Sequence, residues 1–580
     1  MVRLKKIYPT EKYGKYANLQ ELVSASAMRF GDKPLYKYFD ADGQIREMSY
    51  CTFGNETKAI GTALAAYGLL GKRIAILSES RPEWMVGYVA TIGGGGVTIP
   101  LDRELQTEQI RNFLNLSEAN AIFFSAPYEK ALLEMAPELP GVRAFIAFDE
   151  PAEPWPAELA DRLFVYRRMA EDGREMYENG NDAYTSAHVD VYAMSAIIFT
   201  SGTTGTSKGV MLSHDNLLEC VRASANMVNF SSRDVLLSVL PLHHTYETCC
   251  GMLTPICLGA TVCINNSLKY VVRNMNIFRP TGMILVPLFV STIYKKICDE
   301  VRKKGKEKLL ARGIAATKLA RKVGIDLRKP VFAEVRRGLG GRLSKIICGG
   351  AALDPDLVDR FDELGIQIAQ GYGITECAPL VSVNPYTALK YGSVGVPIRG
   401  SSIKILKENG DGAESEAETG SIGEICVKGP QVMLGYYNNP EATKEVFTDD
   451  GYFRTGDLGY VDDEGYIFIT GRKKNVIILA NGKNIYPEEL EEYLYKLDVI
   501  NECVVVAREV GGETLLTAVV YPEYTRFEGA DAEQIKETIK AEIMAVNKHL
   551  PVFKQIRNIE IRKTEFEKTT SKKIKRFLVK

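Results

Sequence analysis

The sequence has no uninterrupted apolar run long enough to span a membrane. Its most apolar segment, Val86–Leu101, is broken by four consecutive glycines. No apolar stretch follows the basic residues 1–10, so no ordinary signal peptide is predicted. The eleven cysteines are scattered without a C-x-x-C pair, which is typical of a reducing compartment. We therefore expect a cytoplasmic protein, with the adjacent Cys249 and Cys250 in its core.

The chain also lacks an excess of charge of either sign. Its formal net charge of -1 gives no reason to expect a nucleic-acid partner. There are only five histidines and no Cys or His at ligand spacing, so His243 and His244 do not indicate a metal site. Apolar residues make up 46% and charged residues 25%, as in ordinary globular proteins. A chain of 580 residues exceeds what one hydrophobic core accommodates, so two or more domains are predicted.

Strand and helix patterns alternate in the first part of the chain. Leu35–Phe39 and Ile45–Tyr50 flank a turn signal and predict a hairpin. The alternation between 57 and 124 predicts crossover units in a parallel sheet. Residues 150–190, rich in charge and proline, are interpreted as a connecting excursion.

Two later changes of texture suggest further boundaries. From Ser393 the chain has short strands and glycine-rich turns, as in a small β-barrel. Near Arg472 the pattern changes again, to that of a compact α+β domain. We therefore predict an N-terminal domain over 1–471 and a C-terminal domain over 472–580.

One glycine- and hydroxyl-rich loop between two apolar strands stands out. The strands are expected at Ala193–Phe199 and from Val210 onward. Glycines let backbone N–H groups approach an anion, hydroxyls add donors, and a lysine adds charge, so the loop suits a polyphosphate. It is not a Walker A loop, because Ser207 and Gly209 stand where that motif requires Gly and Ser or Thr. The candidate residues are Thr200, Ser201, Gly202, Thr203, Thr204, Gly205 and Lys208.

A second unusual stretch is Lys295–Lys345, which holds seventeen Lys or Arg against five Asp or Glu in a largely helical pattern. Two interpretations remain open. It is a solvated helical face, or it is a patch that meets acidic phospholipid or the phosphates of a nucleotide-bearing substrate.

Four motifs in a fixed order carry a family resemblance: the loop at 200–209, Tyr372–Glu376, Tyr452–Asp457 and Gly471–Lys474. From about residue 20 to its end, the chain resembles the adenylate-forming superfamily, which contains acyl-CoA synthetases, carrier-protein adenylation domains and beetle luciferase. The resemblance implies an α/β fold with two stacked α/β subdomains and a small β-barrel in a large N-terminal domain. A mobile α+β C-terminal lid would follow, with a hinge near Lys474.

The resemblance also implies a reaction. A carboxylic acid attacks the α-phosphate of ATP to give an acyl adenylate, and a thiol such as that of coenzyme A then displaces AMP. The loop would hold the departing phosphates, Thr375 would donate its hydroxyl to a phosphate oxygen, and Glu376 would bind Mg²⁺, a cation that prefers oxygen ligands. Tyr372 would face adenine. The remaining residues of this nucleotide site would be Gly350, Ala351, Gln370 and Gly373.

Further roles follow from the same resemblance. Asp457 would accept the ribose hydroxyls, and Arg472 would bind that ribose or a phosphate. The tail segment 567–576 resembles the family's C-terminal motif and would place the catalytic lysine at Lys573. Lys572 replaces the usual glycine there and leaves a rival one residue away.

The acyl and thiol sites are less specific. His244 would line the acyl site, together with Val286–Leu288 and Gly392–Gly395, and Gly482 and Lys483 would contact coenzyme A. The basic insertion and the overall length look most like long-chain fatty acid–CoA ligases. The alternatives are transfer to a separate carrier protein, a medium-chain or aromatic acid substrate, or a non-enzymatic nucleotide sensor. Peripheral membrane contact and a homodimer stay open.

Overall fold

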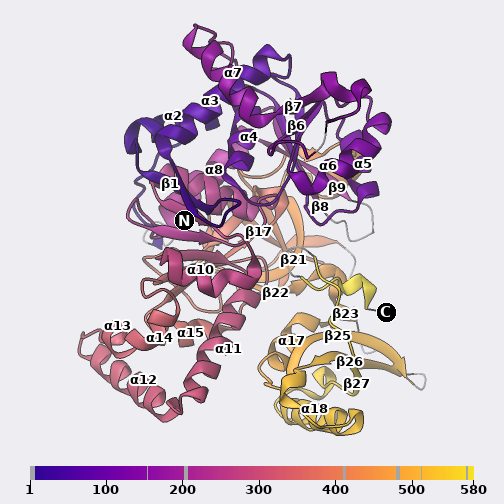
Figure 1. Ribbon diagram of the computed structural model, residues 1–580. Helices are drawn as coiled ribbons and strands as arrows, with labels where there is room; N and C mark the ends of the chain where they lie inside the picture. Colours follow the sequence, from indigo (N-terminus) through magenta and orange to yellow (C-terminus); the bar gives the residue numbers. More distant parts are fainter. Residues whose placement is uncertain are drawn as a thin grey trace. The chain divides into compact units, whose positions relative to one another are not determined.

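A computed structural model describes most of the chain and divides it into two compact units (Figure 1). Unit 1 contains Met1–Ser402 and Lys428–Phe447, and unit 2 contains Ile403–Val427 and Thr448–Lys580. Among the described residues, no helix is both long and apolar enough to cross a membrane. The described residues are 7–152, 154–200, 207–408, 413–478, 484–510, 513–569 and 573–579.

In unit 1, the described residues form two large sheets. The first has eight strands, and its central strands are parallel, as the alternating pattern predicts. Its order is β20 (Gly435–Tyr436), β9 (Lys208–Ser213), β8 (Met194–Thr200), β4 (Val97–Pro100), β3 (Arg73–Leu77), β5 (Ala121–Phe124), β6 (Ala144–Ala147) and β7 (Leu163–Val165). The helices of this part of the chain are α2 (Leu19–Phe30), α3 (Tyr50–Ala66), α4 (Pro82–Gly93), α5 (Thr107–Leu116), α6 (Glu129–Met135), α7 (Tyr166–Glu178) and α8 (His214–Met227).

The second sheet of unit 1 has nine strands in the described part of the chain, and the predicted hairpin forms its edge. Its order is β16 (Val396–Pro397), β15 (Leu380–Val383), β14 (Gln367–Gly373), β13 (Lys345–Cys348), β12 (Gly282–Leu285), β10 (Val235–Ser238), β11 (Thr261–Ile264), β1 (Pro34–Phe39) and β2 (Ile45–Ser49). The associated helices are α9 (Thr254–Leu258), α10 (Val271–Phe278), α15 (Pro355–Glu363) and a π-helix at Tyr246–Leu253; α16 (Pro440–Glu445) follows β20.

The interpretation of 150–190 as a connecting excursion is wrong. The segment adds the parallel edge strand β7 to the first sheet and then forms α7, which packs on α3. A close approach makes this packing possible, because a Cβ at Gly173 would lie 2.0 Å from the backbone oxygen of Ala59. One face of α7 is buried, but the many charged residues on its exposed face make the segment look like a loop when only its composition is considered.

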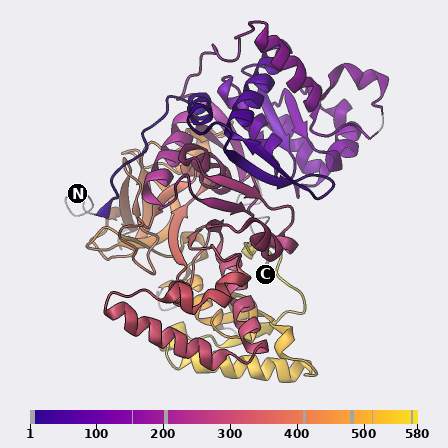
Figure 2. The ribbon, with the colours of Figure 1, turned by 60° about the vertical axis from the view of Figure 1, so that its left-hand side comes forward.

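The basic stretch is helical, as predicted. It forms α11 (Pro287–Lys303), α12 (Glu307–Lys322), α13 (Arg328–Val331) and α14 (Ala333–Gly338). In both views α11 and α12 form a hairpin at one end of unit 1 (Figures 1 and 2). Salt bridges connect this helical stretch to the rest of unit 1, as between Arg321 of α12 and Asp362 of α15 at 2.8 Å.

Unit 2 contains three sheets among its described residues. The largest has five strands and includes much of the segment that was predicted to form a small β-barrel. The order is β18 (Glu414–Glu416), β17 (Ser402–Glu408), β19 (Gly423–Lys428), β21 (Phe453–Val461) and β22 (Ile467–Arg472). The C-terminal part is α+β, as predicted, with a core that includes Leu490, Val505 and Ile539. Its elements are β23 (Ile477–Ile478), β24 (Asn484–Ile485), α17 (Pro487–Leu494), β25 (Ile500–Val510), β26 (Glu513–Pro522), α18 (Ala532–Asn547) and β27 (Asn558–Ile561).

Candidate active site

In unit 1, four parallel strands end at the same edge of the nine-stranded sheet. Strands β10, β12, β13 and β14 pair in parallel through neighbouring strands, so their carboxyl ends point the same way. Ligand sites of open α/β sheets lie at this edge. The edge carries most of the predicted unit 1 residues. They are His244 after β10, Gly350 and Ala351 after β13, Gln370, Tyr372 and Gly373 in β14, and Thr375 and Glu376 after it.

The predicted phosphate loop joins two paired strands of the other sheet. Thr200 at the end of β8 pairs with Lys208 at the start of β9, and the Thr200 hydroxyl donates to the Lys208 carbonyl oxygen at 3.4 Å. The strand–loop–strand arrangement is therefore as expected. The loop residues Ser201, Gly202, Thr203, Thr204 and Gly205 lie outside the described residues.

Tyr436 connects this loop to the Thr375–Glu376 motif. The Lys208 ammonium lies 4.7 Å from the centre of the Tyr436 ring, and the Tyr436 hydroxyl donates to Glu376 Oε1 at 3.0 Å. Burial and the charge of Glu376 raise the pKa of Tyr436, so its hydroxyl stays protonated and remains a donor. The Glu376 backbone is fixed as well, because its carbonyl accepts from Met433 N–H at 2.8 Å. The structure thus brings the predicted phosphate lysine and the predicted metal carboxylate around one tyrosine.

No sequence motif singled out Tyr436. It sits on the two-residue edge strand β20, which pairs with β9 and so reaches Lys208 from a segment more than two hundred residues away. The nearest signal was the Gly435-Tyr436-Tyr437 run, an aromatic pair after a glycine.

Beside β13, a tyrosine occupies the space next to the glycine pair. A Cβ at Gly349 would lie 3.3 Å from the Tyr246 hydroxyl and 3.2 Å from the Gly371 carbonyl oxygen. A side chain at position 349 would therefore be tightly packed against β14 and the π-helix, and Gly350 has a positive φ of 88°, which favours glycine. Tyr246 thus occupies space directly beside Gly349.

The two neighbouring histidines differ in their surroundings. His243 Nε2 lies 3.4 Å from Asp102 Oδ2, but burial lowers the pKa of His243 to about 3, so the ring is neutral at pH 7 and the contact is no ion pair. His244 packs on it with 4.1 Å between ring centres. A structural role for His243 fits this burial, and His244 lies just ahead of the π-helix, an element frequent at functional sites.

Unit 2 contains a second group of predicted residues. Asp457 in β21 is registered with Arg472 in β22, and Arg472 Nε lies 2.8 Å from Asp457 Oδ1. Glu424 supports the turn, because its Oε1 accepts from Gly456 N–H at 3.2 Å and its Oε2 pairs with Lys473 at 3.0 Å. Asp457 is only 3% exposed. A buried carboxylate held in this way is suited to accept hydroxyl donors from a ligand.

Lys573 belongs to the same group of charges. Its side chain keeps solvent contact, yet desolvation by nearby atoms and the charge of Arg472 lower the pKa of Lys573 to about 8, against the opposing charge of Asp457. Desolvation and Arg472 also lower the pKa of Lys474. The tail is held around Lys573, since Lys573 N–H donates to Thr569 Oγ1 at 3.2 Å and Arg576 pairs with the buried Glu491. Lys572, Gly482 and Lys483 lie outside the described residues.

Taken with the two α/β sheets, these groups define an adenylate-forming enzyme, an AMP-forming ligase. A profile of the AMP-binding enzyme family matches residues 23–437, and one of the AMP-binding enzyme C-terminal domain matches 474–579. The chain belongs to the AMP-binding enzyme family. The resemblance and the fold class expected from the four motifs are confirmed.

Individual relatives agree with this family. Long chain acyl-CoA synthetase 6, peroxisomal, of Arabidopsis thaliana is 30% identical over 508 residues, covering 84% of this chain and 71% of the relative. The chloroplastic long-chain-fatty-acid–acyl-carrier-protein ligase AEE15 of the same plant is 26% identical, covering 90% and 78%. The crystal structure of ATP-bound MatB from Rhodopseudomonas palustris has a TM-score of 0.73 at 25% identity and covers 97% of this chain and 98% of that one.

The position of Tyr436 generates a prediction about nucleotide binding. Tyr436→Leu removes both the ring below Lys208 and the donor to Glu376, and we expect ATP binding to weaken by roughly thirtyfold, since a desolvated cation–π contact contributes about 2 kcal/mol. Tyr436→Phe keeps the ring and should lose less. Isothermal titration with ATP measures both, with thermal unfolding as the check on folding. Equal weakening by the two substitutions would contradict a role for the ring.

Proposed function

We propose that the protein is an ATP- and Mg²⁺-dependent long-chain fatty acid–CoA ligase that forms an acyl adenylate and then an acyl-CoA, with AMP and pyrophosphate as the other products. The observation that carries the proposal is the gathering of Lys208 and Glu376 around Tyr436. Because Lys208 and Glu376 contact different parts of Tyr436, the lysine could bind the phosphates of ATP while the carboxylate binds the metal ion.

In the first half-reaction, the chain's contribution is positioning and charge neutralisation. Lys208 would neutralise the departing phosphates. Thr375 would donate a hydrogen bond to a phosphate oxygen. Tyr372 and Gln370, with Gly350 and Ala351 across β13, would bound the adenine.

Glu376 is the residue that would hold Mg²⁺. A single carboxylate fits this ion, which usually takes one or two protein carboxylates together with phosphate oxygens and water. Glu376 Oε1 accepts one hydrogen bond from Tyr436, which fixes its orientation and leaves lone pairs for a cation. When bound, the ion supplies charge neutralisation at the phosphates.

The unit 2 residues would bind the rest of the nucleotide. Asp457 would accept the ribose hydroxyls, with Arg472 holding its carboxylate. Lys573 would bring its charge to the acid and the α-phosphate, and Lys474 would be the hinge whose backbone rotates between the two half-reactions. Gly482 and Lys483 would contact coenzyme A.

The choice of substrate acid and the choice of thiol acceptor are supported to different degrees by the relatives. The names of the two relatives described above refer to a long-chain acyl group and to a long-chain fatty acid, which favours a long-chain acid as the substrate. His244 would line the site for this acid. The acceptors of the two relatives differ, one being CoA and the other a carrier protein. Transfer to a separate carrier protein is therefore the second candidate.

The proposal predicts a substrate profile. ATP–pyrophosphate exchange across acids from acetate to stearate should peak with the long chains, and the thioester product should appear with CoA. A peak with short or aromatic acids would overturn the choice of acid. Product with a phosphopantetheinylated carrier but not with CoA would replace the acceptor.

Lys573 is predicted to serve the first half-reaction alone. Lys573→Ala removes a charge positioned at the reacting phosphate and should slow adenylation by about 3–4 kcal/mol, a loss of several hundredfold. Thioester formation from supplied acyl adenylate should be largely retained. The two half-reactions are measured separately, by exchange and by CoA consumption.

Two neighbours on the tail provide matched controls for that experiment. Lys575→Ala removes the same charge two residues away and should leave both half-reactions near wild type. Lys572→Ala tests the rival lysine. If Lys572→Ala is the crippled variant, or if Lys573→Ala slows both half-reactions equally, the assignment of Lys573 is wrong.

The lowered pKa of Lys573 predicts a pH dependence. The lysine acts as a cation, so kcat/KM for adenylation should fall as the pH rises through about 8, where the side chain loses its proton. Lys573→Arg keeps its charge at every accessible pH and should remove this falling limb. ATP–pyrophosphate exchange rates measured between pH 6 and 10 test this prediction. If kcat/KM still falls near pH 8 in the arginine variant, a group other than Lys573 is responsible for the fall.

A further inference from the structure

A basic cavity of about 390 Å³ lies within the helical stretch of unit 1. This volume is in the range of about 300–1,000 Å³ that is typical of ligand pockets. Its walls come from the end of α10, from α13 and α14, and from the turn before β13. The lining residues are Arg279, Lys329, Ala333, Arg336, Arg337, Gly341, Arg342 and Ser344.

The cavity is separate from the candidate active site. Arg279 lies just before β12 and Ser344 just before β13, and these strands are parallel, with Gly282 opposite Lys345. The cavity therefore sits at the amino ends of the strands, whereas Gly350 and the nucleotide residues follow their carboxyl ends. Five residues of extended chain, roughly 15 Å, separate the two edges.

The charges of this cavity are uncompensated. Within the described residues, none of its five cations forms an ion pair with a carboxylate. The acids nearby are already engaged. Glu334 pairs with Lys304 and Lys306, and Asp326 and Asp362 pair with Arg328. On a solvated helical face, unpaired cations have no reason to cluster around one cavity. In an anion-binding site, such clustering is expected.

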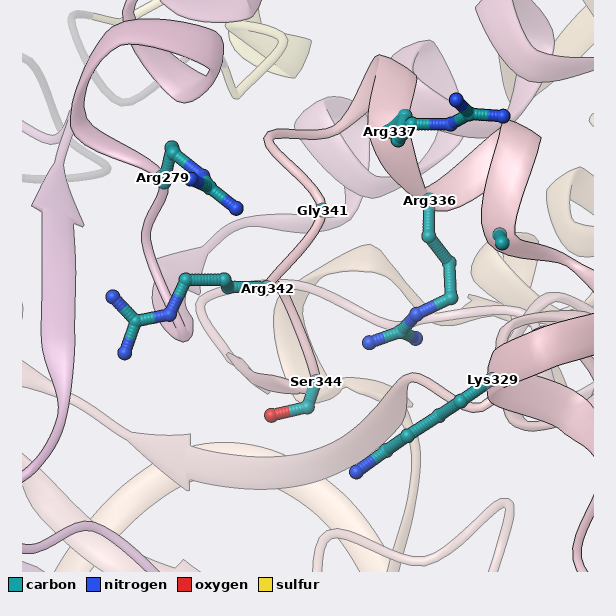
Figure 3. Close-up of a pocket in the computed structure, with 8 residues that line it drawn as sticks. Arg279, Lys329, Arg336, Arg337, Gly341, Arg342 and Ser344 are labelled. Atoms are coloured by element: carbon teal, nitrogen blue, oxygen red, sulfur yellow. The ribbon is translucent and has the colours of Figure 1, made fainter.

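The cations converge from different elements. In Figure 3, Arg279, Arg336 and Lys329 reach toward the middle of the cavity from three segments, while Arg337 and Arg342 point outward at its rim. Arg336 is only 6% exposed, and its guanidinium donates to the carbonyl oxygens of Leu343 at 2.8 Å and Gly365 at 3.0 Å. A charge buried without a carboxylate is costly, so a bound anion would stabilise it.

Exposed apolar side chains adjoin these cations along the chain. The turn from α12 into α13 exposes Val323 by 72%, Ile325 by 53%, Leu327 by 43% and Val331 by 46%, and Lys329 of the cavity lies between the last two. A soluble phosphate would gain nothing from these side chains. A bilayer offers anionic headgroups for the cations and acyl chains for the apolar residues.

We propose that this cavity binds the phosphate headgroup of a phosphatidic-acid-like phospholipid, so that the amino edge of the sheet and the turn 323–331 form a membrane-docking surface. The shape of the cavity favours a terminal phosphate over diffuse attraction, because the inward cations Arg279, Arg336 and Lys329 can donate to several oxygens of one group. Docking at this edge leaves the carboxyl edge free for nucleotide. The inference does not require the ligase activity, and its test does not measure it.

The test is sedimentation of the full-length protein with phosphatidylcholine vesicles that contain phosphatidic acid. Wild type should bind these vesicles far more tightly than pure phosphatidylcholine. Lys329→Glu/Arg342→Glu, at two exposed residues with no side-chain bonds among the described contacts, should bind at least about tenfold more weakly. Val323→Ser/Ile325→Ser should also bind more weakly, because it removes only the inserted apolar surface.

A charge-matched control separates the cavity from net charge. Arg167→Glu/Arg168→Glu changes the charge equally on α7 and should bind like wild type. Equal loss in this control would overturn the proposal. So would equal binding to phosphatidylserine vesicles of the same surface charge, which would indicate diffuse attraction. Titration with inorganic phosphate that shows binding, when vesicles show none, would assign the cavity to a soluble anion instead.

Discussion

Tyr436 holds two opposite charges close together without allowing them to neutralise each other. Lys208 faces its ring and Glu376 accepts from its hydroxyl, so the cation and the carboxylate meet different parts of one side chain. A direct ion pair would compete with a phosphate for Lys208 and with a metal ion for Glu376. The edge strand β20 makes this arrangement possible, because it pairs with β9 and brings residue 436 beside the phosphate loop. The unit 1 part of the candidate site depends on that short pairing.

The nine-stranded sheet has the candidate active site at the carboxyl ends of its parallel strands and the basic cavity at their amino ends. Each parallel strand presents its carboxyl end at one edge, where glycine turns and polar residues follow β13 and β14. Its amino end opens on the helical insertion, where the unpaired arginines gather. Loops at the two edges can change independently, because a β-strand of fixed length lies between them. The basic helical stretch can therefore be accommodated without disturbing the candidate active site.

The sequence predicted best what local patterns encode. The alternation of strand and helix patterns between 57 and 124 predicted the parallel strands, among them β3 and β5. Segment α7 was missed because a helix with many charges looks like a loop when only composition is considered. Tyr436 was missed because its role arises from long-range strand pairing, which no local pattern reports. The ion pairs that distinguish Arg328 from Arg336 are equally invisible in sequence, since both belong to one uniformly basic stretch.

The tail shows how a charge can be held in place while its surroundings lower its affinity for a proton. Arg576 is anchored on the buried Glu491, and Lys568 pairs with Glu502, so the segment on either side of Lys573 is tied to the C-terminal fold. Desolvation, and after it the charge of Arg472, raises the free energy of the charged form of Lys573 and so lowers its pKa. Under the proposed function, a phosphate that binds beside Lys573 and Arg472 would relieve the repulsion between them. Relief of this repulsion would then contribute part of the stabilisation of the nucleotide.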